Sequence, residues 1–238
     1  MKIASWNVNG LRAIMKKDFT ESLHTLQADV LCLQETKTED KTFPAEALKE
    51  AGYVHQAIRG MKSYNGVAVV SRVPFTDEGQ RDGCGKTDGR HLAVRRDGGP
   101  EVQNGYVPAG GDEPDPAVND KFAHKLDFLA EMQSWFGAER KSSDPMVLVG
   151  DLNIAPLEHD VWSHKQLLKV VSHTPIEVAE LGKLQTGLGW VDAVRHFVPE
   201  TEKLYSWWSY RSKNWELADK GRRLDHVWVT EPLKSRLK

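Results

Sequence analysis

Residues 146–156 read Met-Val-Leu-Val-Gly-Asp-Leu-Asn-Ile-Ala-Pro, an apolar run followed at once by polar residues. The run Met146–Val149 has the length and the branched side chains of a buried strand. Asp151 and Asn153 therefore lie just beyond the end of a predicted strand. Polar side chains in such places commonly form the sites of proteins that combine strands and helices.

Two other apolar runs end in the same way. Asn7 follows Ile3-Ala4-Ser5-Trp6, and Glu35 follows the run Val30–Gln34. The oxygen atoms of these side chains favour a hard cation, Mg²⁺ or Mn²⁺, over zinc. The alternative is that each residue only caps a turn, since Asp and Asn favour turns by themselves. The residue types alone leave both interpretations open.

Further strand-length apolar runs and longer amphipathic stretches recur along the chain. The predicted strands are Ile3–Val8, Val30–Leu33, Val67–Val70, Val102–Val107, Met146–Val149 and Leu224–Val229. The amphipathic stretches are Leu11–Leu26 and Phe122–Phe136, a turn is predicted at Asp97–Pro100, and long loops are predicted at 76–90 and 108–120. This mixture predicts packed sheets with helices outside them.

The composition is that of one globular domain. The 238 residues are 39% hydrophobic and 28% charged, and no linker or repeat divides them, so we expect a single domain over residues 1–238. No apolar run approaches the length of a membrane span, and the N-terminus has no signal-peptide pattern. The two cysteines are too few for a disulfide framework, Cys32 is expected to be a small buried thiol, and a reducing, cytoplasmic setting fits.

The charge is unevenly distributed along the chain. The net charge is −2, but residues 195–238 hold 10 Lys/Arg against 6 Asp/Glu. Such a basic segment predicts either a surface for phosphates or an ordinary solvated face.

Six segments together, in this order and spacing, resemble the exonuclease III/AP endonuclease family over essentially the whole chain. They are Ser5–Ala13 (Ser-Trp-Asn-Val-Asn-Gly-Leu-Arg-Ala), Leu33–Lys37 (Leu-Gln-Glu-Thr-Lys), Asn104–Pro108 (Asn-Gly-Tyr-Val-Pro), Gly150–Pro156, Tyr205–Ser212 and Arg223–His226. The resemblance implies an α+β fold, a four-layer α/β/β/α sandwich of two packed mixed sheets with helices outside.

The resemblance also implies roles for individual residues. A Mg²⁺ or Mn²⁺ ion would be bound by Glu35 with Asn7, Asp151 and Asn153 around it. Asp151 would orient or deprotonate the attacking water, and Asn153 would hold the phosphate in line. Tyr106 would contact the phosphate or the leaving oxygen. Asp225 would orient a histidine that supports the reacting phosphorus.

The substrate implied by the resemblance is double-stranded DNA with abasic sites or 3′ ends, cleaved by a monomer. Arg90 and Lys121 match positions of DNA-backbone contacts, although each is equally explained as an ordinary surface charge. Trp207 matches the wall of a pocket for the extruded abasic sugar. Arg222 is placed to wedge into DNA, with a solvated arginine as the alternative.

One family segment has no counterpart in these 238 residues. The family carries a Ser-Asp-His segment whose histidine pairs with Asp225, and none of the nine histidines here occupies that place. His226 is expected to point away from Asp225, because neighbours on a strand face opposite sides. We therefore expect a truncated or impaired enzyme that cleaves abasic DNA poorly.

The predicted function is divalent-metal-dependent DNA phosphodiesterase activity in base excision repair. It would combine incision 5′ to abasic sites with 3′–5′ exonuclease action on duplex DNA. Two alternatives remain at this stage. One is a phosphoesterase of the same superfamily that acts on inositol or sugar phosphates, and the other is a DNA-binding, catalytically impaired fragment.

Overall fold

The structure, a computed structural model, describes residues 1–209 and 213–238. The last three residues of the Tyr205–Ser212 segment, Tyr210, Arg211 and Ser212, lie outside the described residues. The chain divides into two compact units, each described below by itself. Unit 1 comprises Met1–Tyr106 and Pro145–Asp151, and unit 2 comprises Val107–Asp144 and Leu152–Lys238.

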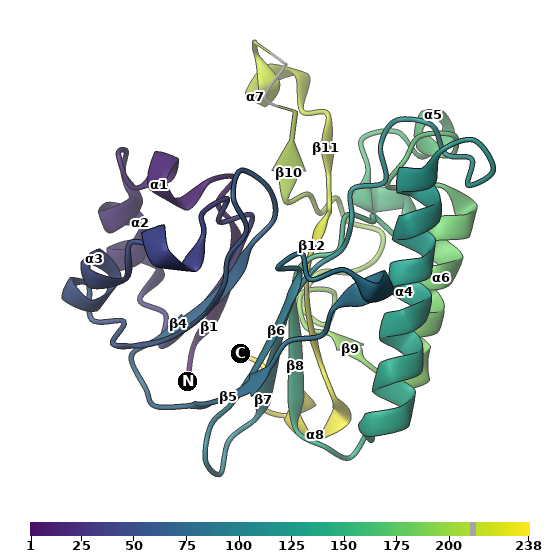
Figure 1. Ribbon diagram of the computed structural model, residues 1–238. Helices are drawn as coiled ribbons and strands as arrows, with labels where there is room; N and C mark the ends of the chain where they lie inside the picture. Colours follow the sequence, from purple (N-terminus) through teal and green to yellow (C-terminus); the bar gives the residue numbers. More distant parts are fainter. Residues whose placement is uncertain (210–212) are drawn as a thin grey trace. The chain divides into compact units, whose positions relative to one another are not determined.

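The first sheet of unit 1 has four strands in the order β1-β2-β4-β3. They are β1 (Ile3–Asn7), β2 (Val30–Gln34), β4 (Val67–Ser71) and β3 (His55–Arg59). β1 and β2 run parallel, whereas the other pairs are antiparallel. Helices α1 (Leu11–Ile14), α2 (Phe19–Leu26) and α3 (Ala45–Glu50) contribute Leu11, Phe19, Leu23 and Leu48 to the core on this sheet (Figure 1).

The second sheet contributes four strands to unit 1 in the order β5-β6-β7-β8. They are β5 (Thr76–Gly79), β6 (His91–Arg95), β7 (Glu101–Tyr106) and β8 (Met146–Asp151). β7 and β8 are parallel and approach closely at Gly105 and Gly150. Gly150 has a φ of 140°, and a Cβ there would lie 1.8 Å from the Gly105 carbonyl oxygen, so only glycine fits.

Buried hydrogen bonds connect the two sheets within unit 1. Asn104 of β7 is fully buried; its Nδ2 donates to the carbonyls of Leu33 and Ala68 at 3.0 Å each. Its Oδ1 accepts from Gln34 Nε2 at 2.7 Å. The polar side chain of Asn104 thus fixes how the two sheets pack.

Cys32 is also fully buried, as expected, and burial raises the pKa of its thiol to about 12.

Unit 2 contains two long helices that lie side by side (Figure 1). They are α4 (Asp120–Glu139), whose N-terminus is capped by the Asn119 side chain, and α6 (Pro175–Gly187), which begins with a Thr174–Glu177 capping box. Strand β12 (Asp225–Val229) pairs antiparallel with β9 (Val191–Asp192), and β10 (Trp207–Trp208) with β11 (Gly221–Arg222). The short helices are α5 (His164–Leu167), α7 (Trp215–Ala218) and α8 (Glu231–Lys234).

The fold class is confirmed: two mixed sheets occur with helices, as in an α/β sandwich. All six predicted strands form, within a residue or two of the expected bounds. The amphipathic stretch Leu11–Leu26 forms two helices, α1 and α2, with residues 15–18 between them. The predicted loop 76–90 was wrong in part, because it contains β5 and a 3₁₀ turn at Gly83–Gly85.

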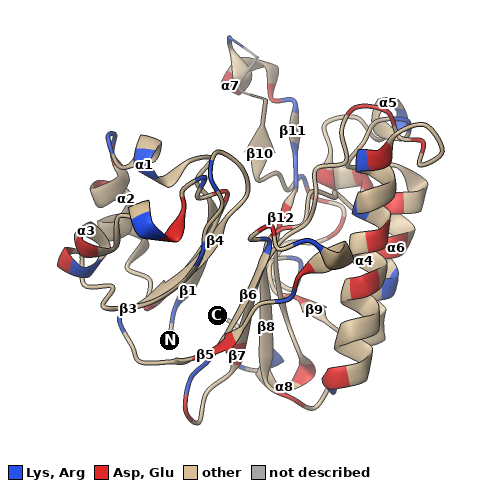
Figure 2. Cartoon of the chain, viewed as in Figure 1, with Lys and Arg blue, Asp and Glu red and all other residues tan. Residues whose placement is uncertain are grey.

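Several basic residues of the segment 195–238 pair with acidic side chains of unit 2. Figure 2 marks the Lys and Arg residues blue and the Asp and Glu residues red. The guanidinium groups of Arg195 and Arg223 are buried against the carboxylate of Asp160. Exposed Lys203 pairs with Asp219. The excess of Lys/Arg in residues 195–238 therefore overstates the positive charge at the surface. In residues 1–209 and 213–238, moreover, no helix combines the length and apolar character that a bilayer crossing needs.

We expect Asn104→Leu to lower the free energy of unfolding by about 3 kcal/mol, because Gln34 Nε2 and the carbonyls of Leu33 and Ala68 each lose a buried hydrogen bond. Urea unfolding measures this loss. Thr76→Val on exposed β5 is the control and changes stability little. A stability of Asn104→Leu equal to that of this control contradicts the bridging role.

Candidate active site

The candidate site of unit 1 forms where two pairs of parallel strands end. Asn7 is the register partner of Gln34 at the ends of β1 and β2, and Glu35 follows directly. Tyr106 is the register partner of Asp151 at the ends of β7 and β8. Each sheet thus supplies one parallel pair, and the carboxyl ends of all four strands carry the polar side chains.

The amide group of Asn7 joins the two carboxylates. Its Nδ2 donates to Glu35 Oε1 at 2.9 Å and to Asp151 Oδ2 at 2.8 Å. Its Oδ1 accepts from the backbone N–H of Asn9 at 3.0 Å, which fixes the direction of the amide. Two negative charges held this close repel each other, so a shared donor stabilises the arrangement.

Lys37 lies against Glu35, although the sequence-based prediction gave it no role. Its ammonium is 2.8 Å from Glu35 Oε2 and also donates to Asn9 Oδ1. Asn9, Glu35 and Lys37 all adopt left-handed backbone conformations, with φ of 45°, 49° and 52°. Such conformations cost non-glycine residues energy and cluster at functional sites. The signal was present, because Lys37 closes the Leu33–Lys37 motif.

Electrostatics keep Glu35 ionised and Tyr106 protonated. Burial by itself raises the pKa of Glu35, but hydrogen bonds from Asn7, Lys37 and Tyr106, with the charge of Lys37, outweigh it and hold that pKa below 4.5. Burial raises the pKa of the Tyr106 phenol, and the charges of Glu35 and Asp151 raise it further. Tyr106 is therefore a hydrogen-bond donor at neutral pH.

Arg90 packs onto Tyr106 and is not a freely solvated charge. Its guanidinium carbon lies 4.9 Å from the centre of the Tyr106 ring, and its Nε donates to Asp88 Oδ2 at 2.5 Å. The sequence-based prediction missed Asp88, two residues before Arg90. This pair places a cation beside the phenol and the carboxylates.

The oxygen-rich set of unit 1 fits a hard divalent cation. Glu35 and Asp151 supply carboxylates, and Lys37 already places a positive group against Glu35. No cluster of three or more His, Cys, Asp or Glu occurs among the described residues. A Mg²⁺ ion suits such a set, because it commonly uses one or two carboxylates, with water and substrate oxygens completing its shell.

Asn153 is fixed within unit 2 by its backbone and its side chain. Its φ is 54°, a left-handed conformation, and its Nδ2 donates to the Val107 carbonyl at 2.9 Å. Its own carbonyl accepts from Lys125 Nζ at 2.9 Å. A side chain and a carbonyl that are both bonded leave the residue little freedom to rotate.

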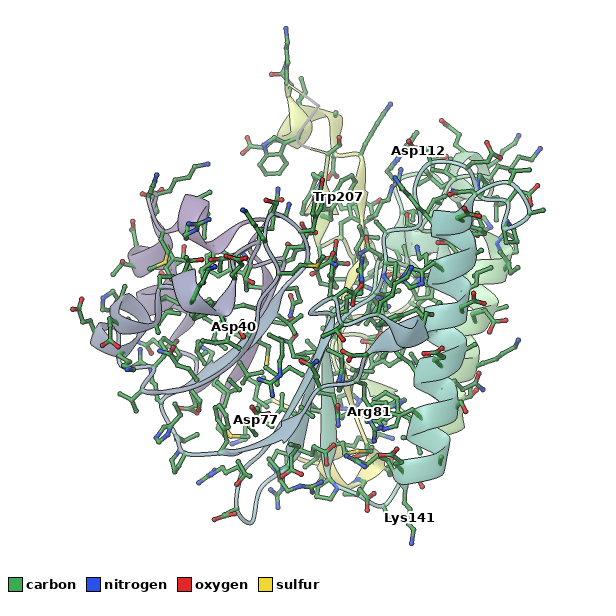
Figure 3. The ribbon with its side chains drawn as sticks, viewed as in Figure 1. Asp40, Asp77, Arg81, Asp112, Lys141 and Trp207 are labelled. Atoms are coloured by element: carbon green, nitrogen blue, oxygen red, sulfur yellow. The ribbon has the colours of Figure 1, made fainter. Side chains whose placement is uncertain are left out.

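Trp207 and Arg222 lie on the paired strands β10 and β11 of unit 2, and Asp225 is the first residue of β12. Ser206 Oγ donates to Asp225 Oδ2 at 2.6 Å, a partner that the sequence-based prediction missed. Trp207 lies on β10 (Figure 3), opposite Arg222 of β11, whose guanidinium carbon is 5.7 Å from the centre of the indole ring. Arg222 also donates to the Val171 carbonyl and to Ser172 Oγ, at 3.0 and 2.8 Å, so its side chain is tied to unit 2.

Lys121 and His226 have opposite surroundings. Lys121 is exposed at the first turn of α4. His226 is almost completely buried, and its Nε2 bonds to the Ile154 carbonyl at 2.7 Å, so it is packed away from solvent. Burial lowers the pKa of His226 to about 4, assisted by the positive charge of Arg223.

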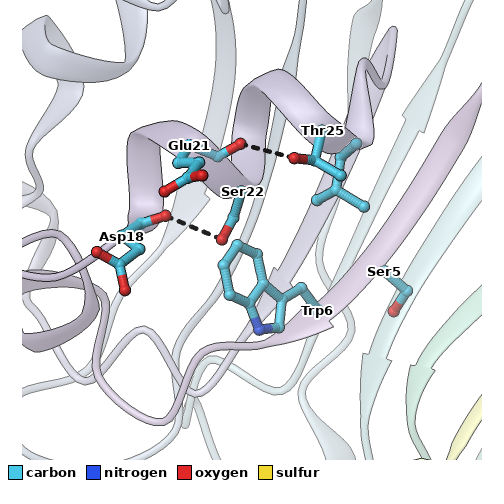
Figure 4. A pocket seen from close by; sticks show the side chains of 7 residues that line it. Ser5, Trp6, Asp18, Glu21, Ser22 and Thr25 are labelled. Atoms are coloured by element: carbon cyan, nitrogen blue, oxygen red, sulfur yellow. Dashed lines mark hydrogen bonds between the residues drawn. The ribbon is translucent and has the colours of Figure 1, made fainter.

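Unit 1 also has an open pocket on α2 (Figure 4). Its lining residues are Ser5, Trp6, Asp18, Glu21, Ser22, Thr25 and Leu26. The hydroxyls of Ser22 and Thr25 bond to carbonyls of the same helix segment, at 2.9 and 3.1 Å. None of the predicted site residues lines this pocket, so we assign it no role.

Comparisons with known proteins show the family to which the chain belongs. A profile of the Endonuclease/Exonuclease/phosphatase family matches residues 4–237. Exodeoxyribonuclease III of Haemophilus influenzae is 31% identical over 247 residues, which cover 99% of this chain and 90% of that protein. An AP endonuclease structure from Archaeoglobus fulgidus is 30% identical with a TM-score of 0.88, covering 99% of this chain and 88% of that one.

A structure of 3′ phosphatase NExo from Neisseria bound to product DNA hairpin is also similar. It is 29% identical with a TM-score of 0.87, and the match covers 99% of this chain and 88% of that chain. The chain thus belongs to the endonuclease/exonuclease/phosphatase family. Within that family it is a member of the exonuclease III/AP endonuclease group, which its six motifs predicted. At this level it is a hydrolase of the DNA-repair nuclease type.

We expect Asn7→Ala to raise the pKa of Glu35, because the carboxylate loses a hydrogen bond while the Asp151 charge stays close. NMR titration of the Glu35 carboxyl measures the change. A carboxyl group whose pKa is lowered by folding stabilises the folded state at pH values above its unfolded-state pKa. That stability is lost as the pH falls through the folded-state pKa. The variant is therefore destabilised at pH 7 and less so in acid. Ser22→Ala on α2 is the control, and an unmoved Glu35 pKa contradicts the bridge.

We expect His226 to make stability fall in mild acid. The unfolded chain takes up a proton near pH 6.5, whereas folded His226 does so only near pH 4, so stability falls as pH drops between those values. The loss from this residue between pH 7 and pH 5 is about 2 kcal/mol. Urea unfolding of the original chain and of His226→Gln at both pH values measures it, and equal pH dependence in the two chains rules it out.

Proposed function

We propose that this chain is a divalent-metal-dependent DNA phosphodiesterase of base excision repair. It would incise duplex DNA 5′ to abasic sites and remove nucleotides from 3′ ends. The family makes it a DNA-repair nuclease, and the exonuclease, AP endonuclease and 3′ phosphatase names of its relatives support these finer assignments. Phosphoryl chemistry of this kind depends mainly on positioning and on stabilising negative charge.

The observation that carries the proposal is the Asn7 amide held between the carboxylates of Glu35 and Asp151. A purely structural pair of strand-end carboxylates would gain stability by separating, because their charges repel. Here left-handed backbone at Glu35 and a second donor, Tyr106, keep the Glu35 carboxylate in the cluster. The close carboxylates and the left-handed backbone lower the local stability but concentrate negative charge, as expected at a site for a cation.

Glu35 would hold the divalent cation, with Asn7, Asp151 and Asn153 proposed as the other groups that support it. When bound, Mg²⁺ or Mn²⁺ would neutralise phosphate charge and help to orient water. The depressed pKa of Glu35 suits this role, because a ligand carboxylate has to be ionised at working pH.

The remaining proposed roles follow from donor and acceptor chemistry. Asp151 would accept a proton from the attacking water. Tyr106, kept protonated by its surroundings, would donate to a phosphate or leaving oxygen. Asn153 would hold the scissile phosphate in line with the water. Asp225, already bonded to Ser206, would orient the histidine of a Ser-Asp-His segment, which residues 1–238 do not contain.

Three residues are proposed to contact the DNA, and a fourth to support one of them. Arg90 and Lys121 would contact backbone phosphates, and Trp207 would form a wall for the extruded abasic sugar. Arg222 would support Trp207 from its neighbouring strand, because its guanidinium is bonded to Val171 and Ser172.

We also infer that residues 1–238 work as one endonuclease/exonuclease/phosphatase domain, since a single family profile runs through residues 4–237. A monomeric state and a cytoplasmic setting stay predictions from the sequence. Gel filtration of the purified chain tests the first of them.

The test is cleavage of an end-labelled abasic duplex with Mg²⁺ and with EDTA. We expect Mg²⁺-dependent incision 5′ to the abasic site, reduced about 10²–10³-fold in Glu35→Gln and Asp151→Asn. Glu39→Gln is the matched control, because Glu39 is a more exposed carboxylate that pairs with Lys41. It is expected to cleave as the original chain does.

The 238-residue chain is compared with a version extended by a Ser-Asp-His segment, and the shorter chain is expected to be slower. An extended chain that yields no product with Mg²⁺ contradicts the proposal. Inhibition by an inositol phosphate but not by duplex DNA would favour a small-molecule phosphoesterase instead. Salt-dependent DNA binding without product from either chain would indicate a binding module.

A further inference from the structure

Three consecutive carbonyls of unit 2 are each bound by a buried basic side chain. Lys125 Nζ donates to the Asn153 carbonyl at 2.9 Å. His226 Nε2 lies 2.7 Å from the Ile154 carbonyl, and His173 Nδ1 lies 2.6 Å from the Ala155 carbonyl. These three donors come from α4, from β12 and from the segment before α6, so they fix the 153–155 turn from several sides.

Lys125 is the costliest of the three to bury. Its side chain is fully buried, and a buried ammonium is unfavourable unless several acceptors surround it. Lys125 Nζ donates to Glu177 Oε1 at 2.5 Å, to the Asn153 carbonyl at 2.9 Å and to the Ala109 carbonyl at 3.3 Å. A methionine would fill the same space without charge, so packing alone does not explain a lysine here.

Glu177 is itself held in place by other groups. Its carboxylate accepts from the backbone N–H of Ser172 at 3.0 Å, from the backbone N–H of Thr174 at 3.2 Å and from Thr174 Oγ1 at 2.6 Å. It is fully buried and belongs to the capping box that starts α6. The ammonium of Lys125 is therefore oriented by a rigid partner.

The neighbouring loop is built to approach Lys125. Gly110 has a φ of 92°, and a Cβ there would lie 2.9 Å from Lys125 Cδ and 3.1 Å from Val171 Cγ1. Any larger residue would push the loop away and lengthen the bond from Lys125 to the Ala109 carbonyl. The loop contributes the backbone carbonyl of Ala109, and not the Ala109 side chain, to the hydrogen bonds of Lys125.

We propose that Lys125, oriented by Glu177, is a positioning residue that fixes the left-handed turn at Asn153 and so aims the Asn153 side chain. The proposal rests on the function proposed above for Asn153. Without Lys125 the Asn153 carbonyl loses its buried donor, and the turn is free to relax from its φ of 54°. A displacement of about 1 Å at a reacting group lowers turnover about 10²-fold.

The test is the double variant Lys125→Met/Glu177→Gln in the full chain extended by the Ser-Asp-His segment. Both charges are removed together, so neither is left buried and unpaired. We expect kcat on the abasic duplex to fall about 10²-fold while KM stays within about twofold. The control is Leu129→Ala, a buried α4 residue one turn further on, compared at temperatures where both variants are folded.

Hydrogen exchange of the Ala155 amide is the second readout, and it does not depend on cleavage. This N–H donates to the Ser172 carbonyl at 2.8 Å. Its protection is expected to fall at least about tenfold in the double variant but not in Leu129→Ala. Unchanged protection, or a kcat equal to that of Leu129→Ala, overturns the positioning role. If the original extended chain cleaves nothing, the proposed function fails, and the exchange result alone decides whether Lys125 holds the turn.

Discussion

The constraint on which unit 1 depends is the confinement of two carboxylates at one place. Glu35 and Asp151 repel each other, and burial strengthens the repulsion because less water screens it. The Asn7 amide, the Lys37 ammonium and the Tyr106 phenol offset that cost. Much of the surrounding architecture follows from this confinement of two carboxylates. Each sheet ends a parallel strand pair at this point, and the adjoining turns take up left-handed backbone to bring the donors in.

The same constraint explains why polar groups run through the interior of unit 1. Asn104 and Gln34 bond to each other between the sheets. Asn104 lies two residues before Tyr106 on its strand, and Gln34 lies one residue before Glu35. An apolar pair there would pack as well but would leave the sheets free to slide. A hydrogen bond with fixed geometry sets how the strands lie, and the strand ends then meet in one arrangement.

The sequence predicts the strands whose runs are wholly apolar, such as Val30–Leu33 and Val67–Val70, because burial on both faces leaves a continuous signal. It does not predict β5, whose residues Thr76–Gly79 are exposed and polar, because pairing with β6 and not composition makes it a strand. In the site, strand-end Asn7, Glu35 and Asp151 were predictable from position. Asp88 and Ser206 were not, because each acts through a contact that only the folded chain creates. Lys37 stands in the Leu33–Lys37 motif, so a signal for it was present and was missed.

The count of Lys and Arg residues predicted the surface charge poorly, because it too ignores the contacts that folding creates. A lysine or arginine in the sequence carries the same formal charge whether it faces water or a buried carboxylate. Arg195 and Arg223 bind Asp160 inside unit 2, and Lys125 binds Glu177 with both side chains fully buried. A cation buried in this way contributes little to the field that a phosphate meets. Such a cation instead fixes local geometry, because an ammonium or guanidinium bonded to fixed acceptors holds the backbone segments that carry those acceptors. In unit 2 the basic residues that matter most to the Asn153 turn are therefore the ones that solvent does not reach.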